Sequence, residues 1–197
     1  EPMPIAMVTK HRWLGLPWRS DLDLLAMGMD RISAAASHVS TLAGLVAREE
    51  LPLSAAAGVF DLQVEASFRF GRSLWAPASG SEKAADAAYE GWARLFLGVP
   101  PWRGPAAALG EMGWRLSGAA RLVGDVASRR AALWALPDGD LYRDVFLGAH
   151  GWEGATWAKA SQVFLSSWGI PDWPVWSIQH PEGTKDGCKA EVLDKLA

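Results

Sequence analysis

Apolar side chains recur at three- and four-residue spacing over most of this chain, and that period constrains its fold more than any other feature. The clearest case lies between residues 81 and 97, where the apolar positions are Ala85, Ala88, Tyr89, Trp92, Leu95 and Phe96. Residues three and four apart lie on the same face of an α-helix, so this spacing predicts an amphipathic helix. Proline and glycine interrupt the pattern repeatedly and divide it into separate helices. The sequence therefore predicts a mainly α fold, an irregular multi-helix bundle.

The remaining helices are predicted from where the period starts and stops. Ser20 or Asp21 can cap a first long helix that runs to about Arg48, and Ser54 opens a second that ends near Trp75. Further helices are expected over residues 105–112, 115–136, a short stretch after residue 140, and 156–168. We expect residues 20–168 to form one helical bundle, with a buried set that includes Leu25, Ile32, Phe60, Val64, Trp92, Phe96, Val123 and Trp134.

The two ends of the chain differ from this bundle. Residues 1–19 carry prolines among apolar residues and predict a short extended lead-in with one short strand. Residues 169–197 predict an extended Trp/Pro-rich arm with a possible short terminal helix, because Pro and Gly recur between residues 170 and 187. Trp173 and Trp176 of this arm suit packing on a neighbouring protein, since tryptophan is enriched at the centres of interfaces.

Composition limits the classes of function. A chain of 197 residues, half of them hydrophobic and 21% charged, can bury one sizeable core. Its formal net charge of −3 offers no strong positive field to a nucleic acid or an anionic membrane. Charged residues interrupt every apolar stretch before the roughly 18 residues that a spanning helix needs, so no transmembrane segment is expected. The opening Glu1-Pro2-Met3-Pro4 lacks an initiator Met and a signal-peptide pattern, so we expect a processed chain or a fragment.

Residues that could ligate a metal are few and scattered. The chain has four histidines, which stand far apart: His11, His38, His150 and His180. A single cysteine, Cys188, excludes a Cys-rich zinc module and an internal disulfide. Three spaced acids, Asp138, Asp140 and Asp144, resemble part of a calcium-binding loop. No Glu stands at the position that would complete the loop, so we interpret them as helix-capping residues. We therefore expect no bound metal and no organic cofactor.

No catalytic motif stands out. The glycines at 148, 151 and 154 lack the Lys-Ser/Thr pair and the preceding strand of a phosphate-binding loop. A Gly-x-Ser-x-Gly nucleophile turn is also missing from the sequence. Since no titratable residues cluster into a recognisable active site, we expect the chain to be non-catalytic.

One predicted helix carries an excess of positive charge. Residues 115–136 contain four arginines and one acid, Asp125, which gives a local charge of +3. At 100° per residue, Arg121 and Arg129 lie about 80° apart and share a face, whereas Arg130 lies on the other side. These arginines can contact a phosphate backbone, or they can simply form a solvated helix face. Arg121 and Arg129 are our candidates for contact with nucleic acid.

Two short segments flank the first two predicted helices. Trp13-Leu14-Gly15-Leu16, before the first long helix, is an aromatic-Leu-Gly-aliphatic step, and Phe70-Gly71-Arg72-Ser73-Leu74-Trp75 is an aromatic-Gly step followed by Leu-Trp. In this order they resemble the region that follows the palm in reverse transcriptases of non-LTR retrotransposons. That family enters its thumb through the first step and closes its second long helix on the second.

Three later segments continue the resemblance. Arg94-Leu95-Phe96-Leu97-Gly98-Val99-Pro100 is similar to an Arg-x-x-Leu-Gly-x-Pro step of the family. Glu111-Met112-Gly113-Trp114-Arg115-Leu116 is similar to its Glu-Leu-Gly-like step, and Pro137-Asp138 before Leu141 to its Pro-Asp turn. Together the matches cover roughly residues 10 to 150, and their joint order carries the resemblance.

The resemblance implies a helical thumb and linker that grips the duplex of template and product when it is joined to its palm. The palm's paired metal-binding aspartates are missing, since no aromatic-Ala-Asp-Asp occurs in this sequence. Its expected partners are therefore a reverse transcriptase palm and, weakly, an RNA–DNA duplex. The alternative is a structural or interaction subunit that docks into a larger protein assembly through tryptophan-rich surfaces such as Trp173 and Trp176.

Overall fold

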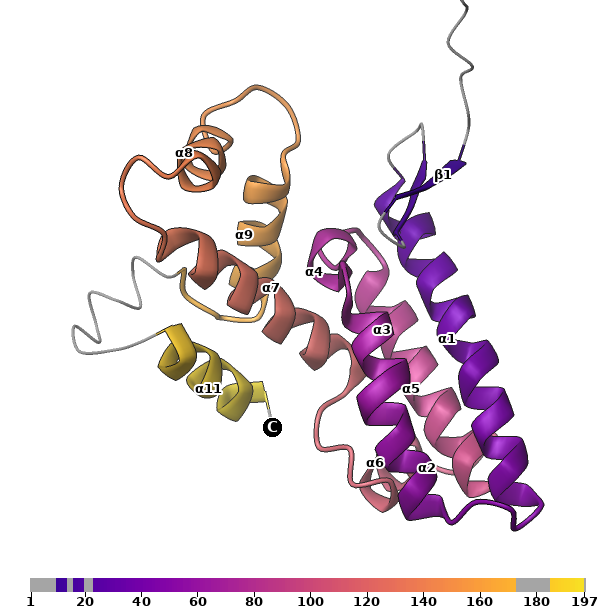
Figure 1. Ribbon diagram of the computed structural model, residues 1–197. Helices are drawn as coiled ribbons and strands as arrows, with labels where there is room; N and C mark the ends of the chain where they lie inside the picture. The colour runs from indigo at the N-terminus through magenta and orange to yellow at the C-terminus, as the bar shows by residue number, and fades with distance from the viewer. Residues whose placement is uncertain (1–9, 14–15, 20–22, 173–184, 197) are drawn as a thin grey trace, which may run out of the picture.

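The computed structural model describes residues 10–13, 16–19, 23–172 and 185–196 (Figure 1). It confirms a mainly α fold, an irregular bundle of helices. The long helices are α1 (Leu24–Ala47), α5 (Ser81–Leu97) and α7 (Gly118–Trp134). The shorter elements are α2 (Leu53–Val59), the π-helical turn η1 (Phe60–Glu65), α3 (Ala66–Arg69), α4 (Arg72–Trp75), α6 (Pro105–Glu111), α8 (Leu141–Gly148), α9 (Trp157–Ser167) and α11 (Lys185–Leu196).

The lead-in forms a small antiparallel hairpin. Strand β1 (Lys10–Trp13) pairs with β2 (Leu16–Arg19), and Trp13 lies opposite Leu16. The extended conformation was predicted, but with one strand in place of two. At the other end, α11 confirms a helix near the C-terminus. Trp173 and Trp176 lie outside the described residues.

Helix α1 begins slightly later than predicted, because its N-cap lies three residues after Ser20 and two after Asp21, the two predicted caps. Asp23 is the N-cap, and its Oδ1 accepts a hydrogen bond from the backbone N–H of Ala26 at 2.9 Å. Gly28 is buried in this helix, and a Cβ added there would lie 2.5 Å from the Trp75 ring. This glycine therefore lets the Trp75 indole pack directly on the α1 backbone, which explains a residue that otherwise weakens a helix.

The second predicted helix, residues 54–75, is wrong as a single element. The chain is helical from Leu53 to Arg69, with a π-helical turn in the middle, and it then breaks at Phe70, whose backbone is extended. Gly71 has φ of 75°, in the left-handed region, and is the N-cap of α4. Because L side chains rarely adopt that conformation, the glycine fixes the break and turns Arg72 inward.

Helices α5 and α6 agree with the sequence. Gly98 ends α5 at φ of 62°, and Pro105 occupies the first turn of α6. Within α5, the side chains of Ala85, Tyr89 and Phe96 are buried as the spacing predicts, but Leu95 is exposed. The apolar stripe of α5 is therefore narrower than the sequence indicates.

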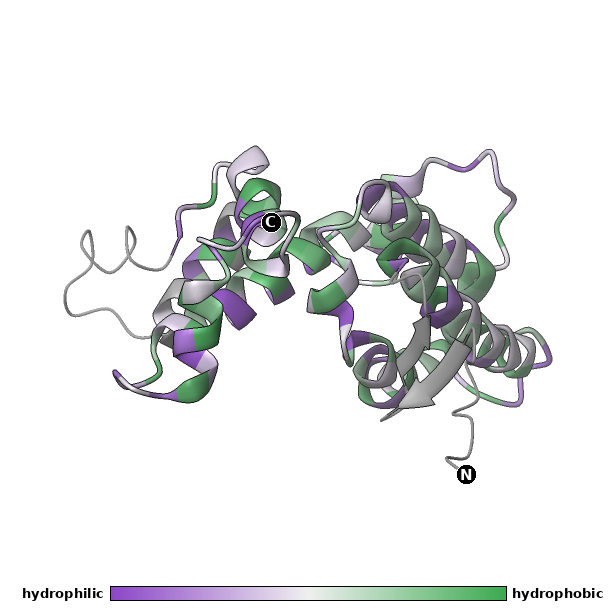
Figure 2. Ribbon diagram, turned by 90° about the horizontal axis from the view of Figure 1, so that it is seen from above, coloured by the Kyte–Doolittle hydropathy of each residue, from purple (hydrophilic) through white to green (hydrophobic). Residues whose placement is uncertain are grey.

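Helix α7 connects two groups of helices. It leaves the group α1–α6 and runs to α8 and α9 (Figure 1), and the two groups are seen separately from above in Figure 2. It begins at Gly118, because Ser117 is the N-cap, and not at Arg115 as predicted. A Cβ at Gly118 would lie 2.3 Å from the Ala85 backbone, so α7 crosses α5 in close contact. Asp86 of α5 also accepts the N–H of Ala119 at 2.7 Å.

Most of the core lies in one cluster that reaches from α1 to α11. Its centre is aromatic: the Phe60 ring stacks on Trp114 at 4.6 Å and packs edge-on against Phe96 at 6.0 Å. A smaller cluster lies under α8, around Phe146 and Ala158. Of the eight residues predicted to be buried, five are buried and three are half-buried, namely Leu25, Ile32 and Trp134.

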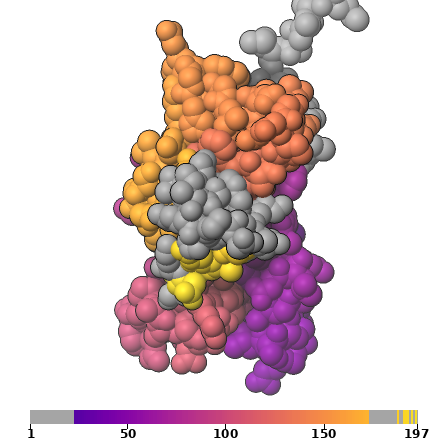
Figure 3. Space-filling view, turned by 90° about the vertical axis from the view of Figure 1, so that its left-hand side faces the viewer, coloured from indigo at the N-terminus to yellow at the C-terminus, as the bar shows by residue number. Residues whose placement is uncertain are grey.

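Helices α8 and α9 are capped by side chains and tied to the first group. Asp140 is the N-cap of α8, as predicted. Thr156 is the N-cap of α9, so this helix begins one residue after the start of the predicted range 156–168. The Trp157 indole N–H donates to the backbone oxygen of Ser73 at 2.8 Å, and the Trp168 indole to Glu82 at 2.5 Å. Figure 3 shows one face of the molecule, with α8 and α9 at one end and α5–α6 at the other. In the part of the chain described, no helix is both long and apolar enough to traverse a bilayer.

Candidate functional site

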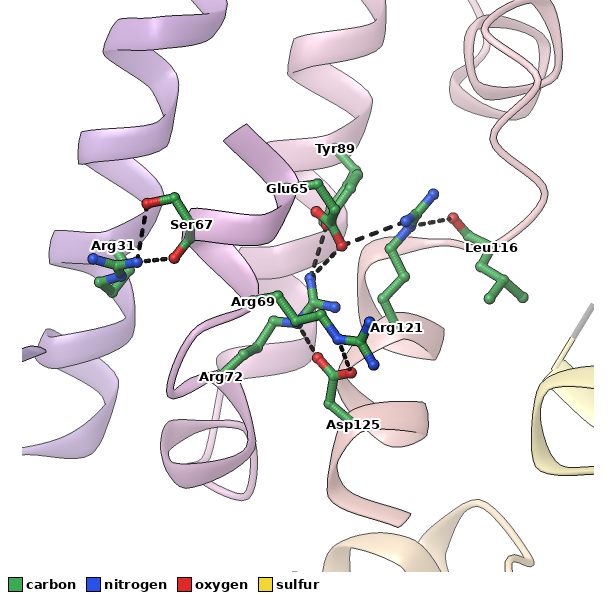
Figure 4. A network of polar contacts seen from close by, with 9 residues as sticks. All are labelled: Arg31, Glu65, Ser67, Arg69, Arg72, Tyr89, Leu116, Arg121 and Asp125. Atoms are coloured by element: carbon green, nitrogen blue, oxygen red, sulfur yellow. Dashed lines mark hydrogen bonds and ion pairs between the residues drawn. The ribbon is translucent and has the colours of Figure 1, made fainter. Parts of the chain in front are cut away.

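Arg72 on α4 is a buried cation with several polar partners, and its side chain is 2% exposed. Its Nε lies 2.5 Å from Oδ2 of Asp125, and its Nη1 lies 3.0 Å from Oε1 of Glu65 (Figure 4). Nη1 also donates to the Tyr89 hydroxyl at 2.8 Å. Four elements thus meet at this guanidinium, because Glu65 ends η1, Tyr89 lies on α5 and Asp125 on α7.

The two carboxylates around Arg72 have further partners. Tyr89 donates its hydroxyl proton to Glu65, and Arg69 donates to Oδ1 of Asp125 at 2.9 Å. The guanidinium of Arg72 also lies over the ring of Phe68, 5.3 Å from its centroid. We call Glu65, Arg69, Arg72, Tyr89, Arg121 and Asp125 the Arg72 network; its three arginines and two carboxylates leave a net charge of +1.

Two groups of this network, the Arg72 guanidinium and the Tyr89 phenol, have clearly shifted pKa values. Burial by itself would lower the pKa of the Arg72 guanidinium. The combined opposing effect of Tyr89, Asp125 and Glu65 is larger, so this pKa lies above the ordinary value for arginine. Burial raises the pKa of the Tyr89 phenol, against the opposing charge of Arg72, so the phenol stays protonated and remains a donor. The network therefore joins η1, α4, α5 and α7 through charged and neutral hydrogen bonds.

Arg121, the first predicted nucleic-acid contact, belongs to this network. Its side chain is 19% exposed, and its Nη1 lies 3.5 Å from Oε1 of Glu65. Its guanidinium lies 4.8 Å from the centroid of the Tyr89 ring, and its Nε is 3.4 Å from the backbone oxygen of Leu116. Much of its hydrogen-bonding capacity is thus directed toward the protein.

Arg129, the second predicted contact, is exposed on α7 two turns beyond Arg121. The two lie on one helix, as predicted, but in different surroundings. Arg69, half exposed at 49%, contributes a second cation beside Asp125. Exposed positive charge near this face of α7 therefore comes from Arg129 and Arg69 more than from Arg121.

Arg130 turns to the opposite side of α7 and is 1% exposed. Its Nε donates to Oδ1 of Asp172 at 2.6 Å, and its Nη2 donates to the other carboxylate oxygen. Its Nη1 donates to the backbone oxygen of Ala158 at 2.6 Å and to the Ser161 hydroxyl at 2.7 Å. The bidentate pair with Asp172 ties α7 to the segment after α9, and the other two hydrogen bonds tie α7 to α9 itself.

An apolar groove lies between α8 and α9, with a volume of about 470 Å³. Its floor is buried and includes Phe146, Ala149 and Ala158. Large apolar side chains stand exposed along it: Leu141, Tyr142, Val145 and Trp152. We call this the α8–α9 groove.

Within the described ranges, no three His, Cys, Asp or Glu side chains come together as a metal site would require. His38 is exposed on α1, and His150 packs its ring 5.3 Å from that of Phe146. The side chains of His11 and Cys188, and all of His180, lie outside what the structure describes. The predicted absence of a metal or cofactor stays a prediction.

Sequence reasoning missed the buried arginines. Arg72 lies in the segment Phe70–Trp75, which carries part of the family resemblance. Its partners Glu65, Tyr89 and Asp125 lie 7, 17 and 53 residues away along the chain, so no local pattern indicates them. Asp125 was the available signal, since it is the lone acid among the arginines of its helix. A lone acid in a basic helix face is a reasonable place to look for an internal ion pair.

No known protein family matches this sequence, and neither a curated protein nor a solved structure shows significant similarity to it.

Proposed function

We propose that this chain is a non-catalytic helical module of the reverse transcriptase thumb and linker type, which grips a template–product duplex when joined to its palm. The observation that carries the proposal is where the resembling segments fall in the fold. The four segments from Phe70 onward lie at joints between helices, and three of them contain a glycine in the left-handed conformation. Matched segments at consecutive joints support a shared succession of helices.

Three of these joints depend on glycine. Gly71 has φ of 75° before α4, Gly98 has φ of 62° after α5, and Gly113 has φ of 70° after α6. Other residues are strained in that conformation, so glycine at these places reflects the path of the backbone. The Pro137-Asp138 segment leads into the N-cap of α8 at Asp140. In the hairpin, Trp13 is paired with Leu16 in the strand register.

The grip itself would use the exposed cations beside α7. Arg129 is exposed, Arg69 is half exposed, and Arg121 lies behind them against Glu65. Exposed arginines can reach phosphate oxygens, and each phosphate contact contributes about −0.9 to the slope of log affinity against log salt. Two contacts predict a weak affinity with a slope of roughly −2.

The test is binding of a short RNA–DNA hybrid to the chain at low and moderate salt. Arg129→Ala should weaken binding several-fold and make the salt slope shallower by about one contact. Arg121→Ala should do so less, because Arg121 faces Glu65. Arg48→Ala is the matched control, since that side chain is 60% exposed at the far end of α1. The grip is wrong if the wild-type chain does not bind at low salt, or if Arg121→Ala and Arg129→Ala both leave affinity and slope unchanged.

A second candidate function is docking into a larger protein assembly. The observation that favours it is the row of exposed apolar side chains on the α8–α9 groove, which would be covered by a partner. Trp102, exposed at 80% between α5 and α6, adds another exposed aromatic. Leu141→Glu should abolish co-sedimentation with such a partner, whereas Arg129→Ala should leave it unchanged.

A further inference from the structure

The α8–α9 groove combines an apolar surface with a rigid floor. Leu141 and Tyr142 are 71% and 72% exposed, and Val145 and Trp152 are about half exposed. Beneath them the Phe146 ring is held between Trp157 on one side and the guanidinium of Arg130 on another, at 6.1 and 5.1 Å between centres. Because Arg130 is itself fixed by Asp172 and Ser161, the floor keeps its shape when the groove is empty.

Polar groups that could orient a small molecule are scarce in this groove. Among its lining residues, Thr156 is occupied, because its hydroxyl donates to the Ala149 oxygen at 3.0 Å and accepts the Lys159 N–H at 3.3 Å. Small-molecule sites of similar volume usually carry a few convergent polar groups. An occupant of this groove would therefore bind by apolar contact inside it. The charged residues at the edges of the groove would decide which occupants bind.

The edges of the groove are acidic. Asp144 lies on α8 about 60° around the helix from Leu141, and Glu153 follows Trp152 directly. Neither carboxylate forms an ion pair among the described residues. Two cations lie near these acids: Arg143 pairs with Asp138, and the Lys159 ammonium donates to the backbone oxygen of Trp152 beside Glu153. Residues 138–159 contain four acids and these two cations, so the edge keeps a net charge of −2.

We infer that the α8–α9 groove binds an amphipathic helix of a partner protein whose apolar stripe is flanked by lysine or arginine. Leu141 and Val145 lie four residues apart on the exposed side of α8, with buried Ala149 one turn further on in the floor, and form a surface of the kind that a second helix packs against. The net negative charge of this edge, to which Asp144 and Glu153 contribute, favours cationic flanks and disfavours an acidic helix, a nucleic acid or an anionic membrane. The inference rests on the docking candidate and is independent of duplex gripping.

The probes are two labelled synthetic helices of about 16 residues, roughly four turns, that share one leucine stripe and differ only in lysine or glutamate flanks. Fluorescence anisotropy with the full chain should show the lysine peptide binding at least about tenfold more tightly than the glutamate peptide. Leu141→Glu should weaken lysine-peptide binding about tenfold or more. Asp144→Asn combined with Glu153→Gln should reduce the difference between the peptides severalfold.

The control is Leu62→Glu, which changes an 80% exposed leucine of η1 outside the groove and should leave peptide affinity unchanged. If both peptides bind equally and Leu141→Glu weakens both, docking stands and selection by the acidic edges is overturned. If neither peptide binds, or if Leu62→Glu weakens binding as much as Leu141→Glu, both fail. A chain that sediments as a dimer, and as a monomer after Leu141→Glu, would assign the groove to a second copy and overturn the inference.

Discussion

The surroundings of Arg72 and the α8–α9 groove invert the usual placement of charge and apolar surface. In the Arg72 network, the buried guanidinium of Arg72 is paired with Glu65 and Asp125, whose side chains are only 12% and 11% exposed. In the groove, four large apolar side chains stand in solvent beside unpaired acids. A buried charge is tolerated when it is fully paired, whereas exposed apolar surface adds little to folding. The first region therefore contributes to stability, and the second is available for binding.

The largest effect should come from removing the central cation. Arg72→Met leaves Glu65 and Asp125 in the interior without their main partner, and loss of one member of a buried pair costs about 3–5 kcal/mol. Chemical denaturation of the variant measures this loss. Arg48→Met, at a fully exposed ion pair, should change the free energy of unfolding far less. An equal loss in both variants would mean that the Arg72 network is not a special feature of the interior.

A slightly smaller effect should follow from Gly118→Ala. The added Cβ meets the backbone of Ala85, so α5 and α7 must move apart, and overpacking of this kind costs about 1–3 kcal/mol. Gly110→Ala is the matched control, because no atom lies within 4 Å of its added Cβ in α6. It should be neutral or slightly stabilising, by up to about 1 kcal/mol. Thermal unfolding of the two variants should differ in direction.

The groove should contribute little to the free energy of unfolding. Leu141→Ser changes an exposed side chain and should alter stability by no more than about 0.5 kcal/mol. Phe146→Ala, which removes the buried floor of the same groove, should cost about 3–5 kcal/mol. If Leu141→Ser were as destabilising as Phe146→Ala, the exposed residues would be part of the core and the comparison between the two regions would fail.

The smallest effect concerns pH. Burial, and then the positive charge of Arg130, lower the pKa of His150 below its ordinary value. Its contribution to stability is therefore present above about pH 6.5, the unfolded value, and is lost as the pH falls from there toward the folded pKa. Unfolding midpoints measured between pH 8 and 5 should show this decline in the wild type. His150→Gln should flatten it, whereas the same change at exposed His38 should not.

The sequence was most informative where local residues decide the structure. Gly98, Pro105 and Asp140 marked helix ends correctly, because capping and backbone conformation act within a few residues. The single helix predicted over residues 54–75 was wrong, although Gly71 carried the signal for the break. The π-helical turn had no comparable signal, since it follows from packing of Phe60 and Val64 in the core.

The candidate site could be predicted only in part. The apolar spacing of α8 was visible, but its exposure depends on how α8 lies against α7 and α9, which no local pattern specifies. Arg121 and Arg129 were placed on one helix correctly. Their difference in environment comes from Glu65 and Tyr89, which are 56 and 32 residues from Arg121 in the sequence.

Helix α7 has a consequence for how the chain unfolds. It carries Asp125 of one arginine network and Arg130 of the other, five residues apart and so about 7.5 Å along the axis. Unwinding of α7 at either residue would separate a buried guanidinium from its carboxylate. Because the main core cluster also reaches from α1 to α9 and α11, the two helix groups belong to one cooperative unit. Amides of α7 should accordingly exchange with solvent as one set, and ligand binding in the α8–α9 groove should slow exchange as far away as Asp125.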